Sequence, residues 1–146
     1  MHRLFQQFGA GDLDELIAFF TETIQSRPDD PQAYHGRGVA YMRRGRYQRR
    51  PDYLGQGDLD KAIADFTRAI RLGSRDPQLY LRRGATYQAN GRVDKAIADF
   101  TQAIALAPGE PTAYLRRARA YELSGERDRA CEDRRKAGQL SADSPD

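Results

Sequence analysis

The stretch DKAIADFTRAI at residues 60–70 returns as DKAIADFTQAI at residues 94–104, with ten identities in eleven positions. A second block, YLRRGATY at residues 80–87, returns as YLRRARAY at residues 114–121, so both blocks recur after 34 residues. A third copy, YHGRGVAY at residues 34–41, precedes residue 80 by 46 residues. The chain is therefore built of sequence repeats with a period of 34 residues, one of which carries 12 additional residues.

The spacing within each repeat predicts two helices. Ala62, Ile63, Phe66, Ala69 and Ile70 follow one another at helical intervals and define one apolar face. The repeats also share residues that favour helix boundaries. Proline suits a first helical turn, glycine suits a helix end, and an acidic residue suits a helix start. We expect these roles for Pro31, Pro77 and Pro111, for Gly45, Gly91 and Gly125, and for Asp58 and Asp94.

These positions resemble the tetratricopeptide repeat, whose pattern is W-x2-L-G-x2-Y, then A-x3-F, then P. The resemblance covers nearly the whole chain. The first aromatic residue is Tyr34, Tyr80 and Tyr114, the small residue Gly38, Gly84 and Ala118, and the second aromatic residue Tyr41, Tyr87 and Tyr121. The second helix supplies Ala62 and Phe66, then Ala96 and Phe100, with Leu16 and Phe20 as a looser copy and Pro28 and Pro108 as closing prolines.

The resemblance implies an all-α, right-handed superhelix (α-solenoid) of stacked antiparallel helix pairs, with about three full repeats plus a partial first one. One domain is expected over residues 1–140, followed by a polar tail at 141–146. Its parts are a partial repeat (1–30), a repeat with an insertion at about 45–56 (31–76), a third repeat (77–110) and a capping repeat (111–140), in which Arg134 replaces Phe.

The leucine of the family pattern is arginine in every copy, at Arg37, Arg83 and Arg117. A partly buried charge requires a partner, and each second helix carries an aspartate just before its Phe position. We therefore expect pairs within repeats, namely Arg37 with Asp65, Arg83 with Asp99 and Arg117 with Asp133.

The insertion is the most basic part of the chain. Because Pro51 disfavours a continuous helix, we expect a protruding loop between the two helices of its repeat. Cations and stackable rings together are typical of nucleic-acid or acidic-peptide sites. The candidate anion-binding residues are Arg44, Arg46, Tyr47, Arg49, Arg50 and Tyr53, with Arg43 beside them. The alternative is a solvated loop without a specific role.

Composition excludes several classes of protein. The 146 residues carry a net charge of +3 and contain no apolar run of membrane-spanning length. The first ten residues lack the features of a secretory signal, so we expect a cytoplasmic protein without membrane association. One cysteine, Cys131, and two histidines, His2 and His35, cannot form a disulfide framework or a Cys/His zinc site.

No catalytic constellation is present, so we expect no enzyme, no metal and no cofactor. His35 follows a packing tyrosine without a nucleophile nearby and is interpreted as a groove-lining or surface residue. Cys131 is interpreted as a small, semi-buried residue of the last helix.

The resemblance places function on a concave face lined by the first helices, where a protein-interaction scaffold or adaptor binds a partner's peptide or helix. Arginines on this face favour an acidic partner. The expected groove residues are Gln32, His35, Val39, Met42, Arg43, Gln78, Leu81, Arg82, Ala85, Gln88, Thr112, Leu115, Arg116, Arg119, Glu122 and Leu123.

Two alternatives remain open. The first is nucleic-acid or other polyanion binding through residues 43–50, helped by Arg116, Arg117 and Arg119. The second is homo-oligomerisation through the incomplete N-terminal repeat, where Leu4, Phe5 and Phe8 either cover the exposed edge or form an apolar patch that self-associates.

Overall fold

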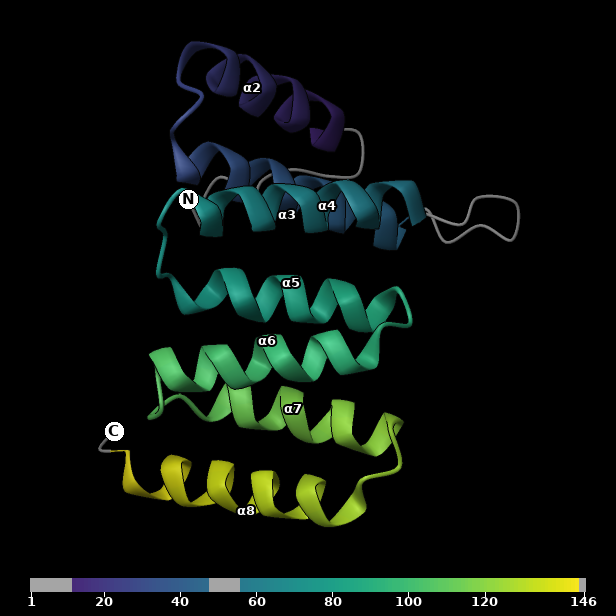
Figure 1. Ribbon diagram of the computed structural model, residues 1–146, viewed down its shortest axis with the longest axis vertical. Helices are drawn as coiled ribbons and strands as arrows, with labels where there is room; N and C mark the ends of the chain where they lie inside the picture. The colour runs from purple at the N-terminus through teal and green to yellow at the C-terminus, as the bar shows by residue number, and fades with distance from the viewer. Residues whose placement is uncertain (1–11, 48–55, 145–146) are drawn as a thin grey trace. The chain divides into compact units, whose positions relative to one another are not determined.

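The computed structural model describes residues 12–47 and 56–144, and within these ranges the chain forms seven helices and no strand (Figure 1). The expected all-α class of helix pairs is confirmed. The helices are α2 (Asp12–Ser26), α3 (Pro31–Tyr47), α4 (Gln56–Arg71), α5 (Pro77–Ala89), α6 (Val93–Leu106), α7 (Pro111–Leu123) and α8 (Arg127–Asp143). Leu4, Phe5 and Phe8 lie outside the described residues.

The chain divides into two compact units, Met1–Ser74 and Arg75–Asp146. In the first unit, α3 packs against both α2 and α4. In the second unit, α5 packs on α6, α6 on α7 and α7 on α8, so that each helix packs on the next one along the chain. The expected repeat boundaries and the single-domain assignment stay predictions.

The first helices begin where the prolines predict. Pro31, Pro77 and Pro111 are the first residues of α3, α5 and α7. Two aspartates not predicted from the sequence cap two of these helices: the carboxylates of Asp30 and Asp76 accept hydrogen bonds from the backbone N–H of Gln32 and Gln78, each at 2.9 Å. These caps satisfy backbone donors that the first turn leaves without helical partners.

Glycine ends the uninterrupted first helices as expected. Gly91 after α5 and Gly125 after α7 have φ angles of 77° and 82°, in the left-handed region that favours glycine. The next residue in each case donates its backbone N–H to a carbonyl five residues earlier, Arg92 to Tyr87 and Glu126 to Tyr121, both at 2.8 Å. This bonding closes the helix in a Schellman motif.

Gly45 does not end α3, so that prediction was wrong. The helix continues through Gly45 to Tyr47, and α4 begins at Gln56. With additional residues between the two helices the chain needs no tight turn after residue 44, and α3 can run four residues longer than α5. Only residues 48–55 of the expected loop remain, and they lie outside the described residues.

Each complete hairpin is centred on a phenylalanine that lies against a glycine. Phe66 and Phe100 are fully buried, and each ring packs on the first helix at Gly38 or Gly84. A Cβ added at either glycine would lie 2.8 or 2.7 Å from the ring, closer than packed atoms approach. In the last hairpin both residues are replaced. Ala118 stands at the glycine position and is buried, and Arg134 stands at the phenylalanine position, outside the core, where it pairs with Glu122.

Candidate functional site

The three expected Arg–Asp pairs are all present. In each, the guanidinium donates two hydrogen bonds to the two carboxylate oxygens. The Nε and Nη2 distances are both 2.8 Å for Arg37 with Asp65, 2.8 and 2.7 Å for Arg83 with Asp99, and 2.8 and 2.7 Å for Arg117 with Asp133. All three aspartates are buried. The pairing within repeats is therefore confirmed.

Two tyrosine rings flank every one of these guanidinium groups. Arg37 lies 5.9 and 6.0 Å from the centroids of Tyr34 and Tyr41, and the corresponding distances are 5.7 and 5.8 Å for Arg83. Such distances permit cation–π attraction. The hydrogen bonds to aspartate outweigh partial burial and raise the pKa of Arg37, Arg83 and Arg117 above its usual value.

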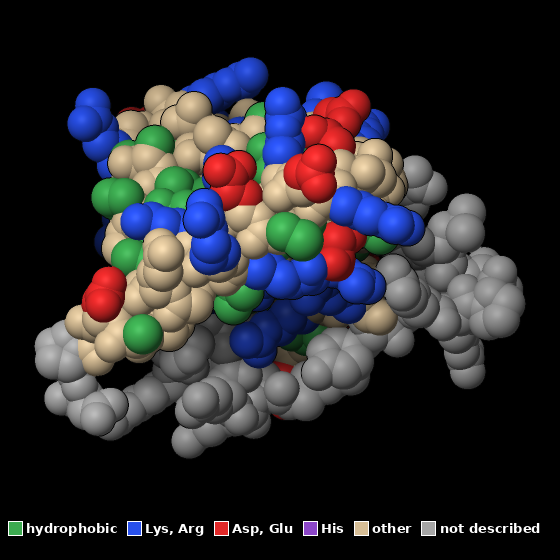
Figure 2. Space-filling view, turned by 90° about the horizontal axis from the view of Figure 1, so that it is seen from below, with side chains coloured by type: hydrophobic (Ala, Val, Ile, Leu, Met, Phe, Trp, Pro, Cys, Tyr) green, Lys and Arg blue, Asp and Glu red, His purple; other side chains and the backbone are tan. Residues whose placement is uncertain are grey.

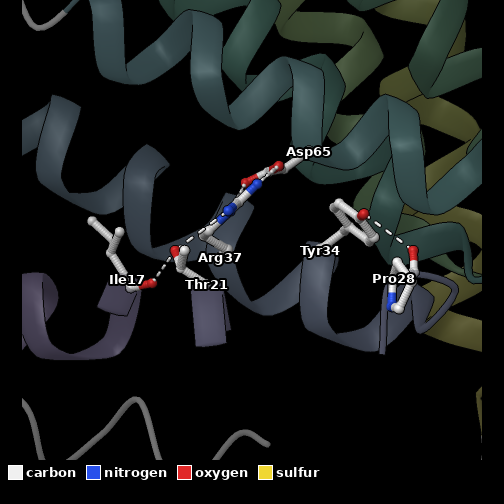
Figure 3. Close-up of polar contacts among 6 residues, drawn as sticks. All are labelled: Ile17, Thr21, Pro28, Tyr34, Arg37 and Asp65. Carbon is white, nitrogen blue, oxygen red and sulfur yellow. Dashed lines mark hydrogen bonds and ion pairs between the residues drawn. The ribbon is translucent and has the colours of Figure 1, made fainter. Parts of the chain in front are cut away.

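Further bonds tie α3 and α7 to the segment before each of them, and Figure 3 shows those of α3. Arg37 donates to the Thr21 hydroxyl at 3.3 Å, and Arg117 donates to Thr101 at 3.1 Å. Tyr34 and Tyr114 donate their hydroxyls to the carbonyls of Pro28 and Pro108, at 3.1 and 3.2 Å. These bonds were not predicted from the sequence, although Thr21 and Thr101 recur in register. The recurring spacing of Arg and Tyr thus serves packing between helices and leaves these side chains occupied.

Helix α7 presents the most accessible part of the expected groove surface. Leu115 and Leu123 are 51% and 53% exposed, although both are large apolar residues. Arg119 lies between them, one helical turn from each, and forms a long ion pair with Glu122 at 3.9 Å. Glu122 is itself held by Arg134. Thr112 and Arg116 are exposed as well, so α7 offers an apolar and cationic face to solvent.

A small cleft lies between α5, α6 and α7 in the second unit. It is lined by Pro77, Gln78, Leu81, Ala103, Ala107, Glu110, Thr112 and Ala113. The structure thereby brings together three expected groove residues, Gln78, Leu81 and Thr112. The volume is about 40 Å³, close to that of one water molecule and far below the several hundred Å³ of small-molecule sites. The cleft can take a methyl-sized group and does not suit a cofactor.

The remaining groove candidates differ in accessibility. Gln32 is exposed, whereas Arg43, Arg82, Ala85 and Gln88 are half-buried. Four others are buried: His35, Val39, Met42 and Leu81. A partner would reach His35, Val39 and Met42 only after the structure rearranged, whereas Leu81 is accessible only as part of the cleft wall, so the exposed side chains of α7 support binding more directly. Groove binding itself stays a prediction.

Arg44 requires a correction, because it is not a loop residue. It lies in α3, donates two hydrogen bonds of 2.8 Å to Asp58 of α4 and reaches Asp14 of α2 at 2.5 Å. Asp58 is only 2% exposed, and these bonds raise the pKa of Arg44 above its usual range. The side chain thus connects three helices and is occupied. Arg46 is exposed and Tyr47 ends α3, whereas Arg49, Arg50 and Tyr53 lie outside the described residues.

His35 and Cys131 also differ from expectation. His35 is buried and packs edge-on against Phe66, with ring centroids 6.1 Å apart, so it is neither a surface nor an open groove residue. Cys131 is an exposed free thiol rather than a semi-buried one. Within the ranges the structure describes, no three metal-ligating side chains converge.

The surface seen from the α8 side carries both charges. Figure 2 shows Lys and Arg side chains interspersed with Asp and Glu, with hydrophobic atoms in small separate patches. Such mixing weakens a polyanion-binding interpretation of this face, which would require one dominant sign. Among the described helices, none combines the length and apolar character needed to cross a membrane.

Three helix pairs that each contain the same Arg–Asp pair define an all-α repeat protein. The tetratricopeptide repeat profile matches residues 51–111 and 81–133, together more than half of the chain. The chain belongs to the tetratricopeptide-repeat family. Proteins of this family generally act as non-catalytic scaffolds for protein–protein interaction.

Solved structures share the fold. "MamA MSR-1" matches with a TM-score of 0.75 and 22% identity, over 92% of this chain and 71% of its own. TTC0263, a thermophilic TPR protein of Thermus thermophilus, matches with a TM-score of 0.77 and 26% identity, over 92% and 68%. A search of curated protein sequences finds no significant match.

Proposed function

We propose that the chain is a scaffold that binds a peptide or helix of a partner protein on its first helices, chiefly on α7. The observation that supports this most is the exposed row Leu115, Arg119, Leu123. Large apolar side chains grouped with an arginine are typical of interaction surfaces. Arg119 favours a carboxylate on the partner, since its ion pair with Glu122 is long.

Binding is proposed to occur without catalysis and without a cofactor. The α5–α7 cleft, to which α7 contributes Thr112 and Ala113, adds one recess of methyl size, which suits an aliphatic side chain of an extended or helical ligand. A cytoplasmic location follows the expectation from the sequence. Polyanion binding is less well supported, because Arg44 is occupied and the α8 side is mixed in charge.

The test compares two exposed leucine sites. Leu115→Asp/Leu123→Asp alters α7, whereas Leu106→Asp is a matched control, since Leu106 is 40% exposed at the end of a second helix. Partners cross-linked in cells of the source organism should fall at least tenfold with the α7 variant and persist with the control. Retention of the same partners by the α7 variant would contradict the proposal.

Salt dependence separates the polyanion alternative. Binding through apolar contacts on α7 should change little between about 50 and 200 mM salt, whereas polyanion binding would fall by orders of magnitude. Retention on heparin that vanishes over this range, together with partners that ignore the α7 substitutions, would favour the alternative.

A further inference from the structure

Helix α2 carries an exposed face that differs from the corresponding face of the other described second helices. Phe19 is 58% exposed, and Glu15 and Glu22, one turn away on either side, are exposed as well. The buried side of α2 is a different one, where Phe20 lies against Gly36 of α3. Among the described helices, α2 packs only on α3.

The repeat register shows what this face does in a complete hairpin. Glu15, Phe19 and Glu22 correspond, 46 residues later, to Lys61, Asp65 and Arg68 of α4. These three contact α3 directly: Asp65 binds Arg37, Lys61 lies 5.5 Å from the Tyr41 ring and Arg68 lies 5.9 Å from the Tyr34 ring. The face is thus the one by which a second helix holds a first helix.

In α2 this face carries different side-chain types: the flanking charges change sign and the central acid is replaced by an apolar residue. Helix α4 presents cation, acid, cation to a first helix that offers Tyr41, Arg37 and Tyr34. Lys95 and Asp99 of α6, and Arg129 and Asp133 of α8, repeat the cation and acid against their own first helices. In α2 the centre is apolar and both flanks are acidic. A Tyr–Arg–Tyr helix would leave its arginine without a carboxylate against Phe19.

We propose that this α2 face docks a helix of a partner protein that carries an apolar residue between two cations. The α3–α4 geometry fixes the spacing, because Tyr34, Arg37 and Tyr41 lie at i−3, i and i+4 opposite α4. The partner therefore presents Lys or Arg at i−3 and i+4 to Glu22 and Glu15, and an aliphatic side chain at i to Phe19. The residues of this face are different from those of the proposed α7 site.

The probe is a peptide derived from α5, PQLYLRRGATYQA, with Tyr80→Lys, Arg83→Leu and Tyr87→Lys, and the native α5 peptide is its control. The protein is the full chain and its variant Glu15→Lys/Phe19→Asp/Glu22→Arg, which gives α2 the face of α4. All three positions are exposed, so the variant should retain its fold, which circular dichroism checks.

The expected result is an exchange of preference in fluorescence anisotropy titrations. The full chain should bind the Lys–Leu–Lys peptide at least tenfold more tightly than the native peptide, and the variant should reverse this order. Equal binding of both peptides to the full chain, or no binding of either, would overturn the proposal. So would self-association in sedimentation that the variant abolishes, because the occupant would then be a second copy of the chain.

Discussion

Hairpins α3–α4 and α5–α6 hold their helices together in the same way but connect them differently. Both contain a bidentate Arg–Asp pair between two tyrosines and a buried phenylalanine against a glycine. The α5–α6 connection is a short turn with Gly91 in the left-handed region. The α3–α4 connection is longer, and a bond from Arg44 to Asp58 joins the end of α3 to the start of α4. Helix pairing therefore does not depend on the turn, provided that the interhelical contacts are kept.

The largest expected effect comes from removing the shared pair. Asp65→Ala and Asp99→Ala should each lower the free energy of unfolding by about 3 kcal/mol, because each leaves a largely buried guanidinium without its carboxylate. Urea unfolding followed by circular dichroism measures the loss, with the exposed Asp29→Ala as a control within about 0.5 kcal/mol. Clearly unequal losses at Asp65 and Asp99 would show that the two hairpins are not held alike.

A smaller effect is expected at the contact found in the lengthened hairpin. Arg44→Met should cost about 2 kcal/mol, since buried Asp58 loses its partner. Arg92 occupies the register position of Asp58 in the uninterrupted hairpin and is exposed, so Arg92→Met should change stability by less than about 0.5 kcal/mol. If Asp58→Leu added to Arg44→Met recovers none of the loss, the unpaired carboxylate is not its cause.

The smallest effects concern two glycines and should have opposite signs. Gly91→Ala should destabilise the protein by about 1 kcal/mol, because its φ of 77° strains any residue with a Cβ. Gly57 lies in the first turn of α4 with open space around it, so Gly57→Ala should stabilise by about 0.5 kcal/mol through helix propensity. Thermal unfolding of the two variants measures both shifts, and a loss of stability in both would contradict this account.

The sequence predicted those features that recur with the period. The prolines that begin the first helices, the left-handed glycines and the partners of Arg37, Arg83 and Arg117 all follow from comparing copies. Thr21, which binds Arg37, recurs too but has a hydroxyl whose bonding the spacing does not reveal.

Features that occur once were predicted poorly. Arg44 has no equivalent in the other copies, so only its proximity to Asp14 and Asp58 in the fold reveals its role. Gly45 matches Gly91 in register, yet its role depends on whether the chain must turn there. Burial of His35 and Leu81 depends on side chains from other helices, and the residue spacing within a single helix does not show these contacts.

The replacement of Gly84 and Phe100 by Ala118 and Arg134 in the last hairpin has a consequence for how sequences of this kind are compared. The side chains at the two positions fill one space in the core. In one copy the Phe100 ring fills it and Gly84 contributes no side chain, whereas in the other copy the Ala118 methyl group is buried and the Arg134 side chain points to solvent. Substitution of the glycine alone makes its new Cβ clash with the ring, and substitution of the phenylalanine alone leaves a cavity. The unit of substitution in this core is thus the pair of residues, and alignments that score each column separately count one event twice.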